Sequence, residues 1–341
     1  MKIVLDVMGG DYSPEQTTQG AVKALNEDKD LKIAMFGDEA AINKILSDSK
    51  CDMSRVEVFD AKDVITNEES PTMAIKLKKE SSLVKSLEYL MANDDADALV
   101  SSGSTGAVLT GAFMKIGRIK GISRPALAPV LPTVTGGSVI LCDCGANVDC
   151  KAVNILHFAY MGAAYAMCQT GVKNPRIGLL SNGAEDKKGN ELTKEAFDLL
   201  KESPLNFVGN CEARDILSGN FDVVVCDGFN GNIALKSAEG TANAVFTLLK
   251  QGIKEGGLSA KLGAALLLKT FKKLKKKLDY NENGGACFLG VNKVVVKSHG
   301  ASKAKSVCAS ILQAKALAES GVVDKINAFV KGFKSEDNKS E

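Results

Sequence analysis

Small and polar residues gather after six predicted strands of this sequence, and these side chains are suited to chemistry on an anion. The six groups are DVMGGD (6–11), SSGSTG (101–106), DCGAN (143–147), SNGAE (181–185), DGFNGN (227–232) and SHGAS (298–302). Glycine lets a backbone approach a ligand closely, and a helix that starts after such a turn offers unpaired N–H groups to phosphate. A single glycine after a strand is usually only a tight turn. Six of them predict one anion site assembled from several loops.

Several other phosphate and nucleophile motifs are absent from the sequence. It contains no G-x-x-x-x-G-K-[ST] and no G-x-S-x-G, and Ser102–Gly111 does not fit G-x-G-x-x-G. These absences disfavour a P-loop nucleoside triphosphatase, a serine hydrolase and a dinucleotide enzyme. Cys142, Cys144 and Cys150 lack the C-x₂-C spacing of structural zinc sites. We therefore expect no metal and no cofactor.

Strands and helices must alternate to bring these turns together. The predicted strands are 3–7, 32–36, 55–59, 98–101, 138–142, 176–181, 222–226 and 293–297, and helical patterns include 14–26, 105–116, 152–169 and 233–250. The first helix has an expected start at Ser13 as N-cap, with Pro14 and Gln16 following. Parallel strands of one sheet carry ligands at their carboxyl ends. The pattern predicts an α/β fold with three α/β/α layers and a mostly parallel sheet.

Composition and charge narrow the class of protein. The chain has 341 residues, of which 45% are hydrophobic and 25% charged, and its formal net charge is only +2. No global field attracts nucleic acid, and no stretch reaches the roughly 20 apolar residues of a membrane span. The nine cysteines occur without a secretory signal, which indicates reduced thiols in the cytoplasm. We expect one catalytic domain over residues 1–333, a protruding segment over 256–283 and a flexible tail over 334–341.

Taken together, the turns resemble the phosphate acyltransferase family of bacterial phospholipid synthesis, the acyl-carrier-protein:phosphate transacylases. The matching segments, in family order, are 6–14, 102–107, 143–147, 179–190, 209–215, 222–236 and 284–302. Ala213 and Lys293 stand where the family commonly has glycine, which affects local loop shape. The resemblance implies a Rossmann-like fold similar to isocitrate dehydrogenase and phosphotransacetylase. It also implies a homodimer, acyl carrier protein as acyl donor, inorganic phosphate as acceptor, and a membrane glycerol-3-phosphate acyltransferase that uses the acyl phosphate product.

Attack of phosphate on a thioester asks mainly for positioning and for stabilisation of an oxyanion. Phosphate is largely dianionic near neutral pH, and a thiolate with a pKa near 8.5 leaves without a strong acid. The groups expected to take part in the step are Asn182, Lys188, Asn230 and His299. The groups expected to bind phosphate or substrate, or to orient the loops that do so, are Asp6, Gly9, Gly10, Asp11, Gly103, Ser104, Thr105, Gly106, Asp143, Asn147, Asp227 and Asn232.

Two of these assignments have ordinary structural alternatives. His299 could steady the oxyanion or lend a proton to the departing thiol, or it could be structural. His157 lies in an apolar helical pattern and is expected to be structural. Lys188 follows Lys187 and precedes Gly189, so it could equally occupy a solvated turn. A cysteine acyl-enzyme is unsupported, because no cysteine adjoins a histidine in the matched motifs.

The segment 258–278 is a basic amphipathic helix. Leu267, Phe271 and Leu274 share one face, and the lysines expected around them are Lys269, Lys272, Lys273 and Lys276. The lysines suit an acidic carrier protein or anionic lipid at the inner face of the cell membrane, and the apolar face suits the membrane interface or a second subunit. The alternative is a solvated surface helix that packs on its own domain.

Three rival functions remain open from the sequence. A phosphotransacetylase acting on a short-chain acyl-CoA would share the fold and the phosphate chemistry. A dehydrogenase of the isocitrate type would need a carboxylate metal cluster and a cofactor loop, and neither is assignable. A binding scaffold without activity would explain the basic helix but not the polar turns.

Overall fold

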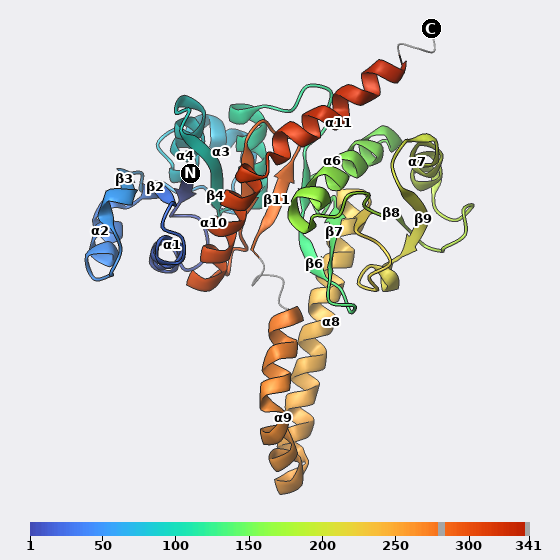
Figure 1. Cartoon of the computed structure of the whole chain (residues 1–341). Coiled ribbons are helices and arrows are strands. Elements are labelled where there is room, and N and C mark those ends of the chain that lie inside the picture. The colour runs from blue at the N-terminus through green and yellow to red at the C-terminus, as the bar shows by residue number, and fades with distance from the viewer. Residues whose placement is uncertain (279–283, 338–341) are drawn as a thin grey trace.

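The computed structural model describes residues 1–278 and 284–337 and divides the strands between two sheets rather than placing them in one (Figure 1). The first sheet has the order β3 (Val56–Asp60), β2 (Lys32–Gly37), β1 (Lys2–Asp6), β4 (Ala96–Ser101), β12 (Val294–Lys297), β11 (Ala286–Leu289) and β5 (Ala126–Ala128). The second has the order β6 (Val130–Pro132), β7 (Ser138–Cys142), β10 (Val223–Val225), β8 (Ile177–Ser181) and β9 (Phe207–Glu212). The antiparallel pairs among the described strands are β12–β11 and β11–β5 in the first sheet and β6–β7 in the second, and the other pairs are parallel. The expected α/β class with mostly parallel strands is confirmed.

Helices cover the sheets and connect the parallel strands. They are α1 (Glu15–Glu27), α2 (Glu39–Ser47), α3 (Pro71–Leu77), α4 (Ser82–Ala92), α5 (Thr105–Gly111), α6 (Ala152–Thr170), α7 (Glu191–Glu202), α8 (Gly228–Glu255), α9 (Gly257–Leu278), α10 (Ala304–Glu319) and α11 (Val322–Asp337). A π-helical turn, Ala112–Ile116, continues α5, and two 3₁₀ turns occupy Met53–Arg55 and Ala213–Asp215. Parallel strands require such crossovers, because a tight turn cannot connect them.

The strands of the first sheet are buried on both faces. Ile3 and Leu5 of β1 belong to one apolar cluster with α1 and α10, whereas Val4 belongs to another with α4 and α5. Successive residues of a strand point to opposite faces. A central strand therefore reads as a continuous apolar run, which is the pattern that predicted it.

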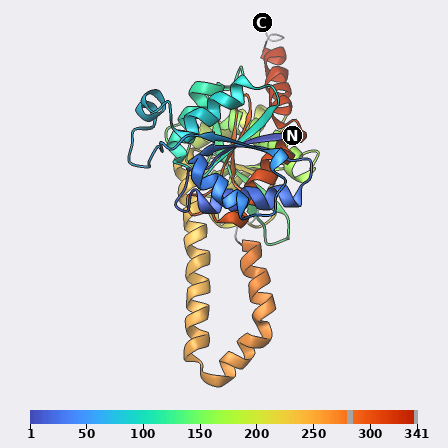
Figure 2. The ribbon, with the colours of Figure 1, turned by 90° about the vertical axis from the view of Figure 1, so that its left-hand side faces the viewer.

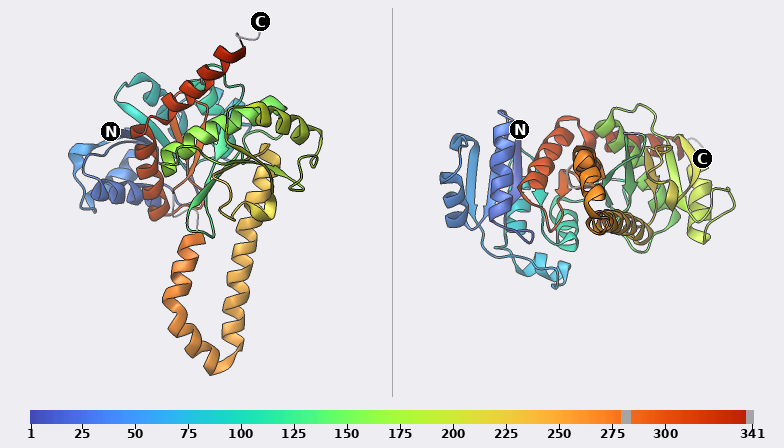
Figure 3. Two further views of the ribbon diagram at one scale, coloured as in Figure 1. Left: turned by 45° about the vertical axis from the view of Figure 1, so that its right-hand side comes forward. Right: turned by 90° about the horizontal axis from the view of Figure 1, so that it is seen from below.

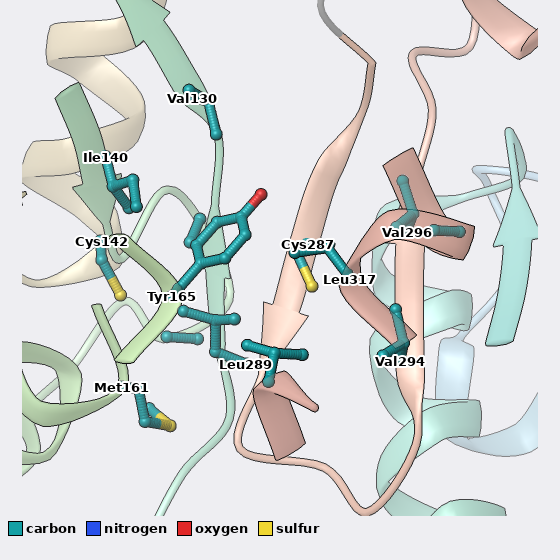
Figure 4. Packing of buried hydrophobic residues seen from close by; sticks show 14 of the residues in the cluster. Val130, Ile140, Cys142, Met161, Tyr165, Cys287, Leu289, Val294, Val296 and Leu317 are labelled. Carbon is teal, nitrogen blue, oxygen red and sulfur yellow. The ribbon is translucent and has the colours of Figure 1, made fainter. Parts of the chain in front are cut away.

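One apolar layer joins the two sheets. In Figure 4 the ring of Tyr165 on α6 lies between Ile140 and Cys142 of the second sheet and Cys287 and Leu289 of the first. Its hydroxyl accepts a hydrogen bond from Gln313 Nε2 at 3.0 Å. The two sheets thus share a core that runs across their junction.

All eight predicted strands are present, with ends that differ by at most two residues. The four missed strands are β5, β6, β9 and β11, of which β5, β6 and β11 have only three or four residues. The expected N-cap was wrong: α1 begins at Glu15 with Pro14 as its cap residue. Ser13 instead donates its hydroxyl to the Gly9 carbonyl and lies 3.1 Å from Thr17 Oγ1. It therefore ties the first polar turn to the helix.

Helices α8 and α9 form a hairpin that projects away from the sheets (Figures 1 and 2). The view from below in Figure 3 looks along this hairpin. The expected protruding segment began at residue 256, but the C-terminal part of α8 forms one arm of the projection and α9 the other (Figures 1 and 2). Residues 279–283 lie outside the described part of the chain. At the other end, α11 reaches Asp337, four residues into the expected tail, and 338–341 are likewise outside it. No helix within 1–278 or 284–337 is long and apolar enough to cross a membrane.

Candidate active site

Three neighbouring strands of the first sheet end in one row of polar residues. β1, β4 and β12 are parallel, and Asp6 pairs with Ser101, which pairs in turn with Lys297. The turns that follow these strands therefore leave the same edge of the sheet. This is the convergence that the sequence predicted for the turns after residues 6, 101 and 297.

The loops at this edge lie against one another. A Cβ on Gly9 would stand 2.5 Å from the amide nitrogen of Gly103, so only glycine fits. Gly10 has φ +100°, a conformation that side chains disfavour. The amide of Asp11 donates to the Gly300 carbonyl at 2.8 Å. The glycines thus allow three loops to form one wall.

Asp6 is a buried carboxylate that helps to position these loops. Its two carboxylate oxygens accept hydrogen bonds of 2.6 Å from the hydroxyls of Ser82 and Ser101. Burial raises the pKa of this carboxyl. Asp6 does not reach the cavities described below, so its place fits the loop-orienting role expected from the sequence.

Lys297 is the residue that the sequence reading missed. Its side chain is buried at the end of β12, where Nζ donates to the carbonyls of Ser298 and, at 3.4 Å, of Ser102. Burial lowers its pKa to about 8, although the charges of Asp6 and Asp11 oppose that shift. A lysine after three valines looks like the solvated end of a strand. The available signal was its position directly before the Ser-His-Gly turn.

Two adjoining cavities, of about 250 and 360 Å³, open at this edge and form one cleft. Both are lined by Thr105, Lys236, Lys297 and His299. Lys236 of α8 also pairs with Glu239 at 2.8 Å. The predicted residues that line the cleft are Gly9, Gly10, Asp11, Gly103, Ser104, Thr105, Asn232 and His299. Two lysines, a histidine and a helix start suit an anion.

His299 presents a defined nitrogen to the cleft. Its Nδ1 accepts a hydrogen bond from the Ala301 amide at 3.1 Å, so in the neutral ring the proton sits on Nε2. Partial burial, together with the positive charges of Lys236 and Lys297, lowers the pKa of the imidazole. The ring is therefore a neutral hydrogen-bond donor near pH 7.

The second sheet contributes a rigid turn and the start of α8. Asp143 is buried, and it accepts hydrogen bonds from the amide of Leu127 at 2.8 Å and from the amide and side chain of Asn147 at 2.7 and 2.9 Å. Burial raises its pKa to about 6. Asp227 caps α8 by accepting from Asn230 N at 2.8 Å and from Asn230 Nδ2 at 2.6 Å. Both aspartates orient backbone.

Half of the predicted site residues do not line the cleft. They are Asp6, Gly106, Asp143, Asn147, Asn182, Lys188, Asp227 and Asn230. Gly106 lies against Pro71. Asn182 and Lys188 are exposed in the β8–α7 loop, where the lysine stem packs beside Gly183. The six residues other than Asp6 and Gly106 follow β7, β8 and β10, which are adjacent in the second sheet; they are Asp143, Asn147, Asn182, Lys188, Asp227 and Asn230.

Cys144 lines the first cavity of the cleft, whereas Cys142 and the second histidine line neither cavity. Cys142 and Cys144 are buried, and burial raises the pKa of both thiols well above its usual value. His157 is half-buried on α6, with Nδ1 3.0 Å from the Ser123 hydroxyl, and lines neither cavity. Among the described side chains, no group of three or more His, Cys, Asp or Glu residues could hold a metal ion.

Known proteins match this chain along almost its whole length. A family described as "Fatty acid synthesis protein" matches residues 1–325. A phosphate acyltransferase of Clostridium novyi is 50% identical over 330 residues, which are 97% of this chain and 98% of that protein. A phosphate acyltransferase of Bacillus cereus is 43% identical over 328 residues, 96% and 98% of the two chains.

Solved structures agree on the fold. A phosphotransacetylase from Streptococcus pyogenes superposes with a TM-score of 0.60 at 19% identity, covering 93% of this chain and 94% of its own. A branched-chain phosphotransacylase from Enterococcus faecalis gives 0.56 at 14%, covering 93% and 99%. Identities this low establish the architecture alone, whereas the sequence relatives establish the family. The chain is therefore an acyltransferase enzyme that belongs to the phosphate acyltransferase family.

Proposed function

We propose that this enzyme moves a fatty acyl group, reversibly, from the thioester of acyl carrier protein to inorganic phosphate, giving an acyl phosphate for phosphatidic acid synthesis. The observation that carries the proposal is the buried Lys297 in a cleft that also holds Lys236, His299 and the start of α5. A buried ammonium is costly unless it meets an anion. Phosphate is the anion that the family's reaction requires.

In the proposed reaction, phosphate binds between Lys297 and the Ser104–Gly106 backbone at the start of α5. An oxygen of the dianion attacks the thioester carbonyl carbon and forms the new C–O bond of the acyl phosphate. The Nε2–H of His299 donates to the oxyanion that develops on the carbonyl oxygen. The C–S bond then breaks, and the sulfur leaves as a thiolate that takes a proton from solvent. No protein side chain becomes acylated.

The second-sheet residues are proposed to face the acyl donor. Asn232 lines the cleft and lies beside Gly145. We propose that it contacts the thioester of the bound acyl donor. Asn230 is occupied by Asp227 and would act mainly by fixing the α8 start. Asn182 and Lys188 lie on an exposed loop, and a closing motion around bound donor would be needed to bring them to the reaction.

The direct test of this function is phosphate-dependent release of free thiol from a panel of acyl carrier proteins loaded with different acyl chains. Release from palmitoyl carrier protein, with little from acetyl-CoA, supports the proposal. Preference for acetyl-CoA would instead support the rival phosphotransacetylase function. The same assay without an oxyanion measures plain hydrolysis, and arsenate in place of phosphate should restore thiol release if an oxyanion attacks the thioester.

Replacing His299 should slow the chemical step more than it weakens phosphate binding. His299→Ala removes the neutral Nε2–H donor, and loss of one such donor costs roughly a hundredfold or more in kcat. His299→Gln, which keeps an N–H donor, should recover part of the rate. Asn230→Ala should act through the helix cap, with a smaller loss and a lower midpoint of unfolding. Near-normal kcat in a folded His299→Ala enzyme would remove this residue from the mechanism.

We further propose that the α8–α9 hairpin contacts the membrane or a second copy of the chain. The most exposed leucines of α9 are Leu258, Leu262 and Leu266, with 77%, 61% and 86% of their surfaces accessible. They share one helical face and sit toward the tip. The predicted Leu267 and Leu274 are 50% and 46% exposed, and Phe271 is half-buried. Side chains beyond Leu274, including Lys276, lie outside the described ones.

This exposed leucine face supports peripheral binding to an anionic membrane, with Lys269, Lys272 and Lys273 exposed beside it. Val245 and Leu248 of α8, 58% and 67% exposed, offer a second face on which a partner subunit could pack. Docking at the inner face of the cell membrane would place the acyl phosphate product beside a glycerol-3-phosphate acyltransferase that uses it.

Acidic substitutions on the leucine face should weaken vesicle binding. Leu262→Glu/Leu266→Glu is expected to lower association with vesicles containing anionic lipid by roughly a hundredfold. The variant loses two leucine side chains that would each bury about half of their surface in the membrane interface. Leu267→Glu/Phe271→Glu should have a smaller effect. The matched control is Met53→Glu/Leu77→Glu, which changes two exposed apolar residues of the body. Equal flotation of all variants would end the membrane proposal.

A further inference from the structure

An open groove of about 500 Å³ lies outside the catalytic cleft and has a distinct chemistry. Its lining includes apolar Leu109, Phe113, Met114 and Pro125 and two arginines, Arg118 and Arg124. We name it the arginine groove. Phe113 and Met114 are 45% and 41% exposed. Exposed aromatic and methionine side chains beside arginine are typical of protein interfaces.

The groove adjoins the cleft through α5. Thr105 lines both cavities of the cleft, and Leu109, four residues on, lies on the same helical face and lines the groove. Four residues of helix span about 6 Å. The 143–147 turn forms a second link, because Gly145 lines the cleft and Asn147 lines the groove. A molecule held in the groove is therefore within reach of the reacting centre.

The two arginines are fixed in place but keep their charge unpaired. Arg118 donates to the Ser123 carbonyl, and its guanidinium stands 5.0 Å from the ring centre of Phe113. Arg124 donates to the Asp149 carbonyl at 3.1 Å. Neither forms an ion pair with a carboxylate of the described chain, and the nearby Lys115 is already paired with Glu88 at 2.6 Å. The groove thus offers positive charge to an external anion.

We propose that the arginine groove is the docking surface for the acidic acyl carrier protein, with its acyl-bearing arm directed along α5 into the cleft. This inference rests on the proposed function. Charge complementarity selects this occupant, since apolar contacts alone would suit many surfaces but two unpaired guanidinium groups favour an anionic one. It assigns carrier recognition to the body of the enzyme and leaves the hairpin lysines for the lipid surface.

The test compares one full and one truncated acyl donor. Arg118→Gln/Arg124→Gln keeps hydrogen-bond donors for the two carbonyls but removes both charges. Its kcat/KM for the acyl carrier protein should fall roughly tenfold to a hundredfold. Its kcat/KM for an uncharged acyl N-acetylcysteamine thioester should stay at the wild-type value. Added salt should raise the KM of the wild type for the carrier and barely change that of the variant.

Control substitutions of charged residues outside the arginine groove test whether the groove itself binds the carrier. Lys50→Gln/Lys173→Gln removes two exposed charges outside helices and strands and should leave both donors unaffected. Overturning results are an unchanged carrier KM in the arginine variant, an equal loss in Lys272→Gln/Lys273→Gln, or a change from dimer to monomer in the arginine variant, which would make the groove a self-interface. If the wild type itself releases no thiol from the acyl carrier protein, the proposed function fails rather than the docking surface.

Discussion

Lys297→Met is expected to lose most phosphate-dependent activity while the folded enzyme becomes no less stable. The lysine supplies a charge to the cleft from a buried position. Removing a buried partner of a charged ligand typically costs 2–5 kcal/mol, so kcat/KM for phosphate should fall by roughly a hundredfold or more. Methionine keeps the length and apolar stem of the side chain without its charge.

The stability expectation follows from the direction of the pKa shift. Burial lowers the pKa of Lys297 from 10.5 to about 8, so the folded protein holds this proton less tightly than the unfolded chain. Below pH 8 the charged form therefore costs about 3 kcal/mol of stability, and the cost disappears as the pH rises from 8 to 10.5. Without phosphate, Lys297→Met should match or exceed the wild type at pH 7, and the difference should shrink toward pH 10.5.

Phosphate binding should follow the same titration of Lys297, but here the protonated lysine is favourable, whereas for stability it is costly. Only the protonated lysine attracts phosphate, so the KM of the wild type for phosphate should rise as the pH passes 8, and phosphate should raise the melting temperature more at pH 7 than at pH 9.5. The matched control is Lys293→Met at the opposite end of β12, where Nζ donates to the Ala96 carbonyl at 2.8 Å. A normal KM for phosphate in Lys297→Met would assign the anion site to other groups.

The architecture could be predicted from the sequence because buried parallel strands appear as continuous apolar runs. Val4, Leu99 and Val295 lie in unbroken apolar runs, and each polar turn marks the strand end before it. The turns of the first sheet converge as expected, and His299 and Ser104 line the same cavity. The division into two sheets was not predictable, since β5 and β6 are separated only by Pro129 and are too short to read.

The chemistry of individual site residues was harder to predict, because it depends on burial. Lys297 and Lys188 are both lysines near glycine, yet one is buried in the cleft and the other exposed on a loop. Asn230 matched a family motif, but its amide is taken by Asp227. A sequence gives residue type and order, whereas the pKa of a lysine or the freedom of an amide is set by neighbours that come from distant segments.

The start of α8 supplies the last prediction, because two glycines of one helix should respond oppositely to the same change. A Cβ on Gly231 would stand 1.9 Å from the Asp143 carbonyl oxygen and 2.8 Å from Cys226 Sγ, whereas a Cβ on Gly240 would meet nothing within 4 Å. Gly231→Ala should therefore lower the free energy of unfolding by about 3 kcal/mol or more. Gly240→Ala should raise it by about 0.5–1 kcal/mol, since alanine favours helix.

The same clash should also reach the cleft. Relief of the overlap at Gly231 moves α8 away from the 143–147 turn, and these two segments place Asn232 and Gly145 in the cavity wall. Gly231→Ala should therefore lose activity at temperatures where it is still folded, while Gly240→Ala keeps the wild-type rate. Urea unfolding and the thiol-release assay on the same preparations measure both effects. Wild-type stability in Gly231→Ala would mean that the helix start and the turn are not in contact, and the second sheet's contribution to the cleft would then need another structural basis.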